Sequence, residues 1–440
     1  MMPALKRRLQ NLYYRSPLLF RTDAFFNRIR RRIKNRGQNW NEEKREREKT
    51  TGPDDIQSLK ELLRFLDSTD SKVYGREIIE DYEDNANKSI LLVSHELSFS
   101  GAPIVLLNLA ESLKRKGFQT IMICGLDGEK FSENAALKGI PVVYYPELQK
   151  SDMIARIRKL FVRIIVSTIR CVHVIRQLNA TDSSVMWWIH EAGCCYRRGT
   201  AKEMPDRVAD NIHIYSGGLY AGRLLVSRFP GYKVENLPFG VPDLKNALNS
   251  GSARMNLPDK KIFALVGPVC YRKGQDVLAR AVEQLPEKVR KDCFFLFVGK
   301  NTEPWITDVV INVQKKFPEN ILYLDEIKYD DLCRLYYDID CLICTSRDDP
   351  GPAVVGESMS LGKPSICSEH TSAAAVIEQY HAGYVYRHNS SGELARRIVA
   401  AFGLSRDQYE EMSKNARRAY EQEYSEQVFE KKLNKCMERI

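Results

Sequence analysis

Apolar residues in this chain recur in short runs that alternate with amphipathic stretches of helical length. In the first half the runs are Ile90–Val93, Thr120–Cys124, Val142–Tyr145, Arg163–Ser167, Val185–His190 and Ile212–Tyr215. In the second half they are Ile262–Val266, Phe294–Val298, Ile321–Leu324, Cys341–Cys344 and Ser365–Ser368. Short continuous apolar runs separated by helical segments are typical of buried parallel strands. The pattern therefore predicts an α/β protein with doubly wound, Rossmann-like domains.

Helices are expected between these strands, and one Pro- and Gly-rich segment divides the alternation into two halves. Clear examples of predicted helices are Ile104–Lys116, which Gly117 ends, and Asp330–Tyr337. The dividing segment is Asn236–Asp243. We expect an N-terminal domain over residues 88–242, a C-terminal domain over 243–415, and a last helix over 416–440 that packs back toward the first domain. Such domains face each other across a cleft.

The net positive charge of the chain lies in its first fifty residues. They hold 15 Lys or Arg and 5 Asp or Glu, which equals the net charge of +10 for all 440 residues. Basic residues mixed with Leu, Tyr and Phe predict that this segment docks to an anionic membrane surface or to a partner protein. It belongs to an expected N-terminal extension over residues 1–87, which includes a helix from Asp55 to Leu66. A solvated extension is the alternative. Nucleic acid is not expected, because no nucleic-acid-binding motif accompanies the charge.

Other general features restrict the location and the chemistry. No apolar run is long enough to span a bilayer, and the basic N-terminus does not resemble a secretory signal. We expect a cytoplasmic protein that attaches peripherally to the inner face of the cell membrane. The eleven cysteines are scattered, and Cys341 and Cys344 fall on opposite faces of a strand, so neither a disulfide nor a zinc site is predicted. Asp338-Ile339-Asp340 resembles a metal-binding D-x-D, but its position indicates a helix-to-strand connector, and no metal is expected.

The segment Asp349–Ser365 carries the strongest chemical signal. An acid, Asp349, precedes a Pro-Gly-Pro turn and an apolar helical run, and a second acid, Glu357, follows eight positions later. The first amides of a helix have no partner within the helix and bind anions. With an acid on either side of a phosphate, such a turn suits a sugar nucleotide. An ordinary capped helix is the alternative for this stretch alone.

Taken with the motifs around it, this segment resembles that of the retaining family-4 glycosyltransferases (glycosyl transferases group 1). The resemblance covers roughly residues 88–440 and implies the GT-B fold. It implies that Glu357 holds the donor ribose and Asp349 the donor sugar, with Ser346 as in the family's P-S-x-x-E pattern. Asp349 stands where the family usually has Glu, which shortens the side chain by one methylene.

A second motif, GPVCYRKG, resembles the family's G-R-x4-K-G element. The resemblance implies that Lys273 contacts the leaving diphosphate. Pro268 stands where the family has an arginine, and Arg272 is the candidate to supply that charge. In the first half, Gly101 and Ala102 resemble the Gly-rich loop that approaches the donor phosphates and the acceptor. His190 matches the family's histidine near the reacting sugar.

The resemblance implies further donor contacts. Gly240 is one of them, Glu326 and Ile327 contact the base, and Glu369 lies near the sugar. The remaining contacts are at the helix start: Gly351, Pro352, Ala353 and Val354. The resemblance also implies transfer of a sugar, with retention, from a nucleotide-sugar co-substrate to a glycan or lipid-linked acceptor in bacterial surface polysaccharide synthesis. No other cofactor is implied. A non-catalytic nucleotide- or glycan-binding subunit and a sugar-nucleotide hydrolase or epimerase remain alternatives.

Overall fold

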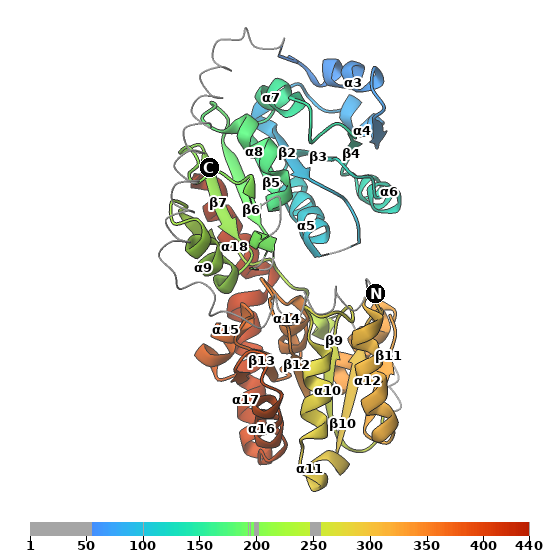
Figure 1. The fold of residues 1–440 in the computed structure, drawn as a ribbon. Helices are drawn as coiled ribbons and strands as arrows, with labels where there is room; N and C mark the ends of the chain where they lie inside the picture. The colour runs from blue at the N-terminus through green and yellow to red at the C-terminus, as the bar shows by residue number, and fades with distance from the viewer. Residues whose placement is uncertain are drawn as a thin grey trace, which may run out of the picture.

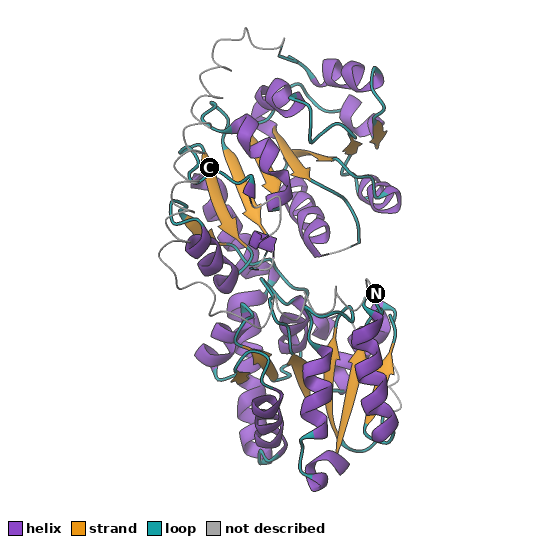
Figure 2. Ribbon diagram, in the orientation of Figure 1, coloured by secondary structure: helices purple, strands orange, loops and turns teal. Residues whose placement is uncertain are grey.

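The computed structural model describes residues 55–99, 101–191, 193, 195–197, 202–246 and 257–439 of the 440-residue chain. They form two α/β lobes, one above the other in Figure 1, each built on a sheet with helices on both faces (Figure 2). This is the predicted pair of doubly wound domains. The membrane- or partner-docking prediction for residues 1–50 lies outside the described residues.

The sheet of the N-terminal domain has eight strands in the order β1-β4-β3-β2-β5-β6-β7-β8. They are β1 Lys72–Tyr74, β2 Ser89–Ser94, β3 Gln119–Cys124, β4 Val142–Tyr144, β5 Arg163–Ser167, β6 Val185–Ile189, β7 Ile212–Ser216 and β8 Val234–Asn236. All neighbours pair in parallel except the edge strand β1, which is antiparallel to β4. The expected strand Val185–His190 thus ends one residue early, and His190 is the first residue beyond it.

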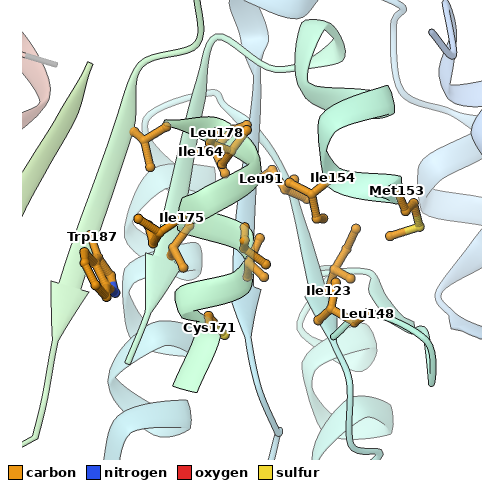
Figure 3. Close-up of a cluster of buried hydrophobic side chains, with 14 of the residues drawn as sticks. Leu91, Ile123, Leu148, Met153, Ile154, Ile164, Cys171, Ile175, Leu178 and Trp187 are labelled. Carbon is orange, nitrogen blue, oxygen red and sulfur yellow. The ribbon is translucent and has the colours of Figure 1, made fainter. Parts of the chain in front are cut away.

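Alternate residues of these strands enter two separate cores, because side chains on a strand point to opposite faces. Leu91, Ile123, Ile164 and Trp187 face one side, where α7 and α8 cover them (Figure 3). The helices on this face are α3 Leu59–Asp67, α4 Arg76–Glu80, α7 Met153–Ile157, α8 Val172–Leu178 and α9 Leu219–Arg228. The continuous apolar runs of the sequence therefore reflect burial on both faces.

Residues 55–87 were grouped with the extension in the prediction, whereas the structure packs them onto the N-terminal domain. Leu62 and Leu66 of α3 are 0% and 1% exposed and join the same core as the central strands. The α3 helix begins at Leu59 and not at Asp55, because Ser58 caps it by accepting a hydrogen bond from the Glu61 amide. The domain therefore begins before residue 88.

The other face of this sheet carries α5 Gly101–Arg115, α6 Glu129–Leu137 and the last helix, α18 Glu426–Arg439. Phe429 of α18 stacks on Trp188 of β6 with ring centroids 5.9 Å apart. Glu430 accepts a hydrogen bond from Ser112 of α5. The C-terminal helix is consequently a part of the N-terminal domain's core, beside β6 and β7 in Figure 1.

The sheet of the C-terminal domain has six parallel strands in the order β11-β10-β9-β12-β13-β14. They are β9 Lys261–Val266, β10 Cys293–Val298, β11 Ile321–Leu324, β12 Cys341–Cys344, β13 Ser365–Ser368 and β14 Gly383–Tyr386. One face carries α13 Tyr329–Asp338, α14 Ala353–Ser360, α15 Ala373–Tyr380 and α17 Arg406–Ala419. The other carries α10 Gln275–Glu283, α11 Glu287–Lys291, α12 Pro304–Lys316 and α16 Ser391–Phe402. Cys341 and Cys344 lie in different cores, as their spacing predicted.

The chain crosses between the domains twice, and the two crossings lie side by side. The first runs through Val241, and the second is a π-helical turn, Tyr420–Tyr424, between α17 and α18. The Val241 amide donates to the Tyr424 carbonyl at 2.7 Å, and the Tyr420 hydroxyl donates to the Val241 carbonyl at 2.9 Å. This pair of crossings links the domains at one end of their interface. Within the described part of the chain, no helix is both long and apolar enough to cross a membrane.

Candidate functional site

The turn between β12 and α14 lies at the carboxyl edge of the C-terminal sheet. Strand β12 ends at Cys344, and α14 begins at Ala353, directly after Pro352. The Pro352 nitrogen carries no hydrogen, so this position adds no unpaired donor at the helix start. Asp349 lies in this turn and is 3% exposed. Its carboxylate accepts hydrogen bonds from Ser346 Oγ at 3.0 Å and from the Gly351 amide at 3.3 Å. The first acid of the motif is therefore buried at the helix start.

Two cations from the loop after β9 meet this carboxylate. Lys273 Nζ lies 2.7 Å from Asp349 Oδ2, and Arg272 Nη1 lies 3.5 Å from the same oxygen. Burial raises the pKa of Asp349, but Lys273 and Arg272 outweigh it, and the net shift is downward. The Asp349 carboxylate thus faces two cations at the start of α14. Cations and the free amides of a helix start together suit a phosphate.

The loop 267–274 is folded so that its proline contributes only its backbone. The Pro268 carbonyl accepts a hydrogen bond from Gln275 Nε2 at 3.0 Å, at the start of α10. The loop ends at Gly274, whose φ of 73° favours glycine, and a Cβ there would meet the Thr345 carbonyl oxygen at 2.3 Å. The loop therefore presses against the β12–α14 turn. The cations that face Asp349 are Arg272 and Lys273 of this loop.

Glu357 lies in the second turn of α14. Its Oε2 accepts a hydrogen bond from the Tyr336 hydroxyl of α13 at 2.7 Å. Burial raises the pKa of Glu357, and the hydrogen bond from Tyr336 opposes this shift. The side chain is therefore oriented by a neighbouring helix and keeps one oxygen for which no hydrogen bond is recorded in the described part of the chain.

An open pocket lies between the domains beside the start of α14. Its space, including solvent at the mouth, is about 480 Å³. The lining comes from both domains and from the second crossing: Gly217, Gly218, Leu219, Asn236, Pro238, Phe239, Gly351, Pro352, Ala353, Ser372, Ala373, Val376, Glu423 and Tyr424. Lys273 and Glu357 are outside this lining. The pocket therefore meets the β12–α14 turn at Gly351 and Pro352 and the start of α14 at Ala353.

His190 extends the site into the N-terminal domain. Its ring packs on Trp188 with centroids 4.6 Å apart, and a Cβ placed on the pocket residue Gly217 would lie 3.4 Å from His190 Nδ1. Its Nε2 is buried and has no hydrogen-bond partner among the described residues. Burial lowers the pKa of His190 to about 4, so the imidazole is neutral at pH 7. The buried Nε2 points away from solvent, whereas Nδ1 is the ring nitrogen that lies toward the pocket residue Gly217 and can bond a polar group there.

Three other predicted site residues lie on α5 and at the first domain crossing. Gly101 and Ala102 form the first turn of α5, and a Cβ on Gly101 would meet nothing within 4 Å. Gly240 packs against α18, where a Cβ would lie 2.9 Å from Glu426 Cα, so the structure places it at the crossing and outside the pocket lining. Glycine there is required by the close approach of α18.

The remaining predicted contacts lie on the C-terminal domain. Glu326 and Ile327 follow β11; Glu326 is exposed, with its amide bonded to Asp325, and Ile327 packs partly against the core. Val354 likewise packs against that core. Glu369 is exposed, and its Oε1 accepts a hydrogen bond from the His388 amide at 2.9 Å. The Glu369 carboxylate is thus bonded to the loop after β14, within its own domain.

Contacts across the cleft were missed from the sequence. The Gly193 amide donates to Asp348 Oδ1 at 3.2 Å, next to the Asp349 turn. Tyr220 of α9 stacks on His370 with centroids 5.6 Å apart. Gly218 approaches the C-terminal domain so closely that a Cβ there would lie 2.2 Å from the Pro350 carbonyl oxygen. Nothing in the local sequence indicates such contacts, because they depend on how the domains are placed.

The D-x-D sequence has the structural role predicted for it. Helix α13 ends at Asp338, β12 begins at Cys341, and Asp340 Oδ2 accepts a hydrogen bond from the Ile262 amide at 2.7 Å. Among the residues that the structure describes, no group of three or more His, Cys, Asp and Glu side chains has the arrangement of a metal site.

Comparison with protein families decides the assignment. Residues 86–214 match the model of "Glycosyl-transferase family 4", and residues 253–419 match "Glycosyl transferases group 1". Together the matches cover more than half of the chain. The chain belongs to glycosyltransferase family 4. Its fold is accordingly GT-B, as the sequence motifs implied.

Individual relatives of this glycosyltransferase are distant. Spore coat protein SA of Bacillus subtilis (strain 168) is 27% identical over 269 residues, which are 56% of this chain and 70% of that protein. A glycosyltransferase from Rickettsia africae ESF-5 superimposes with a TM-score of 0.64 at 17% identity, covering 81% of this chain and 99% of the other. Anabaena Alr3699/HepE, solved in complex with UDP-glucose, has a TM-score of 0.64 at 15% identity, covering 80% and 100%. The two solved structures support the fold alone.

Proposed function

We propose that this glycosyltransferase moves a sugar, with retention at the anomeric carbon, from a nucleotide-sugar donor to a glycan or lipid-linked acceptor. The observation that carries the proposal is the meeting of Lys273 and Arg272 at Asp349, beside the start of α14. The departing nucleoside diphosphate is an anion, and preorganised cations and helix amides stabilise charge that develops as the bond breaks. UDP is the proposed nucleotide, since Anabaena Alr3699/HepE was solved with UDP-glucose.

Each neighbouring residue has a proposed part. The amides at Gly351–Val354 and the Lys273 ammonium hold the diphosphate, and Glu357 accepts from the ribose hydroxyls through its second oxygen. The neutral His190 hydrogen-bonds a hydroxyl of the sugar. Backbone at Glu326 and Ile327 meets the base. The Gly101 turn, which faces open space, approaches the donor when the domains close.

The proposed chemistry is a front-face displacement. The bond from the anomeric carbon to the diphosphate oxygen breaks while the acceptor oxygen bonds to the same face of the sugar. The acceptor proton passes to the departing diphosphate oxygen. No protein nucleophile and no metal take part in this scheme, because the diphosphate serves as the base and the cations of the loop 267–274 neutralise its charge.

Nucleotide specificity is the first test. We expect UDP-sugars to raise the melting temperature more than GDP- or dTDP-sugars, since a ligand that binds only the folded state stabilises it by mass action. The product formed with an accepting glycan is then examined by proton NMR, where retention preserves the anomeric configuration of the donor. An inverted product would refute the retaining mechanism, and the absence of stabilisation by any nucleotide sugar would refute the donor site.

A non-catalytic nucleotide-binding role is the second candidate, favoured by Pro268 in place of the family's arginine. It predicts stabilisation by UDP without transfer to any glycan. Hydrolase or epimerase activity would instead appear as free sugar, or as an epimerised donor, when no acceptor is present. Transfer at rates far above hydrolysis excludes both alternatives.

Bacterial surface polysaccharide synthesis is the proposed setting, and the name of the spore coat relative is in keeping with it. The first fifty residues are proposed to dock the enzyme on anionic lipid or on a partner protein. Full-length protein is expected to sediment with phosphatidylglycerol-containing vesicles and to be released by salt, because exposed charges are screened. Vesicle binding by a variant that lacks residues 1–50 would argue against this role.

A further inference from the structure

A buried arginine, Arg347, lies two residues before Asp349 and is 8% exposed. Its guanidinium forms a two-pronged ion pair with Asp276 of α10, with Nη1–Oδ1 and Nη2–Oδ2 distances of 2.8 Å. Asp276 is 2% exposed. Such planar, bidentate pairs fix the geometry of both partners more tightly than a lysine would. The pair therefore anchors the β12–α14 turn to the first turn of α10.

The same arginine also holds the loop that carries the cations. Its Nη1 donates to the Tyr271 carbonyl, and its Cζ lies 3.9 Å from the centre of the Tyr271 ring. Its backbone amide donates to the Arg272 carbonyl at 2.7 Å. Thr345 adds a hydrogen bond from its hydroxyl to the Lys273 carbonyl at 2.7 Å. Backbone carbonyls at three successive loop positions are thus fixed by the segment that leads to Asp349.

Arg347 has one further partner that extends this network. Its Nε donates at 2.7 Å to Oδ1 of Asn389, which has a positive φ of 60° in the connection between β14 and α16. All three nitrogens of the guanidinium thus donate to acceptors, which lie on the loop 267–274, on α10 and on the β14–α16 connection. Because the side chain is buried and bonded in this way, an effect on a donor is expected to pass through the loop.

We propose that Arg347 is a positioning residue for donor binding: paired with Asp276, it fixes the backbone of residues 271–273 so that the Lys273 ammonium meets the donor diphosphate at the start of α14. This inference rests on the proposed donor site. It assigns a role in phosphate recognition to a pair that does not touch the phosphate. Movement of the loop by an ångström would misplace the ammonium without altering the base and ribose contacts.

The test compares UDP with uridine, which lacks the phosphates. Wild-type protein is first titrated with both. Arg347→Met is then expected to weaken UDP binding by about ten-fold to one-hundred-fold, the range for a lost charge-assisted hydrogen bond, while uridine binding stays unchanged. Arg347→Lys keeps the positive charge but cannot form the bidentate pair with Asp276, and it is expected to give an intermediate loss of UDP affinity. Isothermal titration calorimetry suits UDP, and ligand-observed NMR suits uridine.

Arg280 supplies a matched control. It also bonds Asp276, but from the exposed side of α10: its side chain is 52% exposed, and its Nε donates to the Asp276 carbonyl one turn back in the same helix. Arg280→Met is expected to leave both affinities unchanged. If Arg347→Met does not fold, the double variant Arg347→Met/Asp276→Leu removes both buried charges together, which buried pairs often tolerate.

The outcomes separate the possibilities. A selective loss of UDP binding in Arg347→Met or in the double variant supports the positioning role. Equal losses for UDP and uridine, or a wild-type affinity for UDP in a folded variant, would overturn it. Failure of the wild-type protein to bind UDP would instead count against the proposed donor site.

Discussion

The Lys273 ammonium lies 2.7 Å from Oδ2 of Asp349, a carboxylate that is 3% exposed. The residue expected to hold the leaving diphosphate is therefore bonded to the residue expected to hold the sugar. Arg272 lies 3.5 Å from the same oxygen, and its Nη1 also donates to the Asp348 carbonyl at 3.2 Å. Donor binding is therefore expected to change the contacts of Lys273.

Replacing Lys273 is expected to lower transfer strongly. Lys273→Met should reduce kcat by about 100-fold to 1,000-fold, the range seen when one preorganised donor to a developing anion is lost. The same change leaves Asp349 buried beside Arg272 alone, so the free energy of unfolding should also fall. Steady-state kinetics and urea denaturation measure the two effects.

The double variant Lys273→Met/Asp349→Asn separates catalysis from stability. Removing the carboxylate charge should restore much of the unfolding free energy, because no uncompensated buried charge remains. Activity should stay low. Recovery of activity along with stability would show that Lys273 acts only as a structural partner of Asp349.

Glu357 is expected to recognise the ribose. Glu357→Gln should weaken UDP binding by about ten-fold to one-hundred-fold, since hydrogen bonds to a charged acceptor contribute roughly 1.5–3 kcal/mol. A UDP analogue that lacks the ribose hydroxyls should bind the wild-type protein and the variant equally. Tyr336→Phe, which removes the hydrogen bond to Oε2, should weaken UDP less. Continued discrimination between UDP and the analogue by Glu357→Gln would contradict the assignment.

The central strands were predictable because their physical signal is local. Burial on both faces forces a continuous apolar run, and the expected Ile321–Leu324 and Cys341–Cys344 coincide with β11 and β12. Strands β1, β8 and β14 were missed, the last because only helices were expected after Ser368. All three lie at edges of the sheets, and apart from Tyr386 their side chains are exposed or half-buried, so no continuous buried run marks them. Their pairing is decided by the neighbouring strand.

The site was predictable only in part, for a related reason. The family resemblance implied that Lys273, Asp349 and Glu357 serve one donor site; the structure places Lys273 at Asp349 and Glu357 in the second turn of α14. The direct Lys273–Asp349 bond and the contact of Gly193 with Asp348 were not predicted, because they depend on how separate loops and domains meet. Gly240 shows the converse: a glycine expected beside the donor is required by the packing of α18.

His190 and Glu191 are neighbours whose titrations should affect stability in opposite directions. Burial lowers the pKa of His190 to about 4 and raises that of Glu191 to about 7. The unfolded chain protonates His190 near pH 6.5 while the folded chain does not, so this residue costs stability as the pH falls from about 6.5 to 4. Glu191 stays protonated in the folded chain up to about pH 7, so it costs stability as the pH rises from about 4.5 to 7.

Single variants should reveal the pH dependence of the unfolding free energy that each residue contributes. Each pKa shift changes the free energy of unfolding by at most about 3 kcal/mol. Between about pH 4.5 and 6.5 the pH dependences that the two residues contribute largely cancel. Relative to wild type, His190→Gln should gain stability at pH 5 compared with pH 7, and Glu191→Gln should gain at pH 7 compared with pH 5. Urea denaturation at the two pH values measures both. Parallel pH profiles for wild type and both variants would contradict the assigned shifts.

Gly218 is expected to set how closely the domains approach. Its φ of 178° is open to any residue, so the requirement for glycine is steric: a Cβ would lie 2.2 Å from both the Pro350 carbonyl oxygen and Ser372 Oγ. Gly218→Ala should force the domains apart at the pocket, raising the radius of gyration in small-angle scattering and lowering kcat, while each domain stays folded. Gly403→Ala, where the nearest atom is the Val399 carbonyl oxygen at 3.4 Å, is the matched control and should change neither. An unchanged radius and rate for Gly218→Ala would mean that the domains accommodate the methyl group by small shifts, and that this contact does not determine their separation.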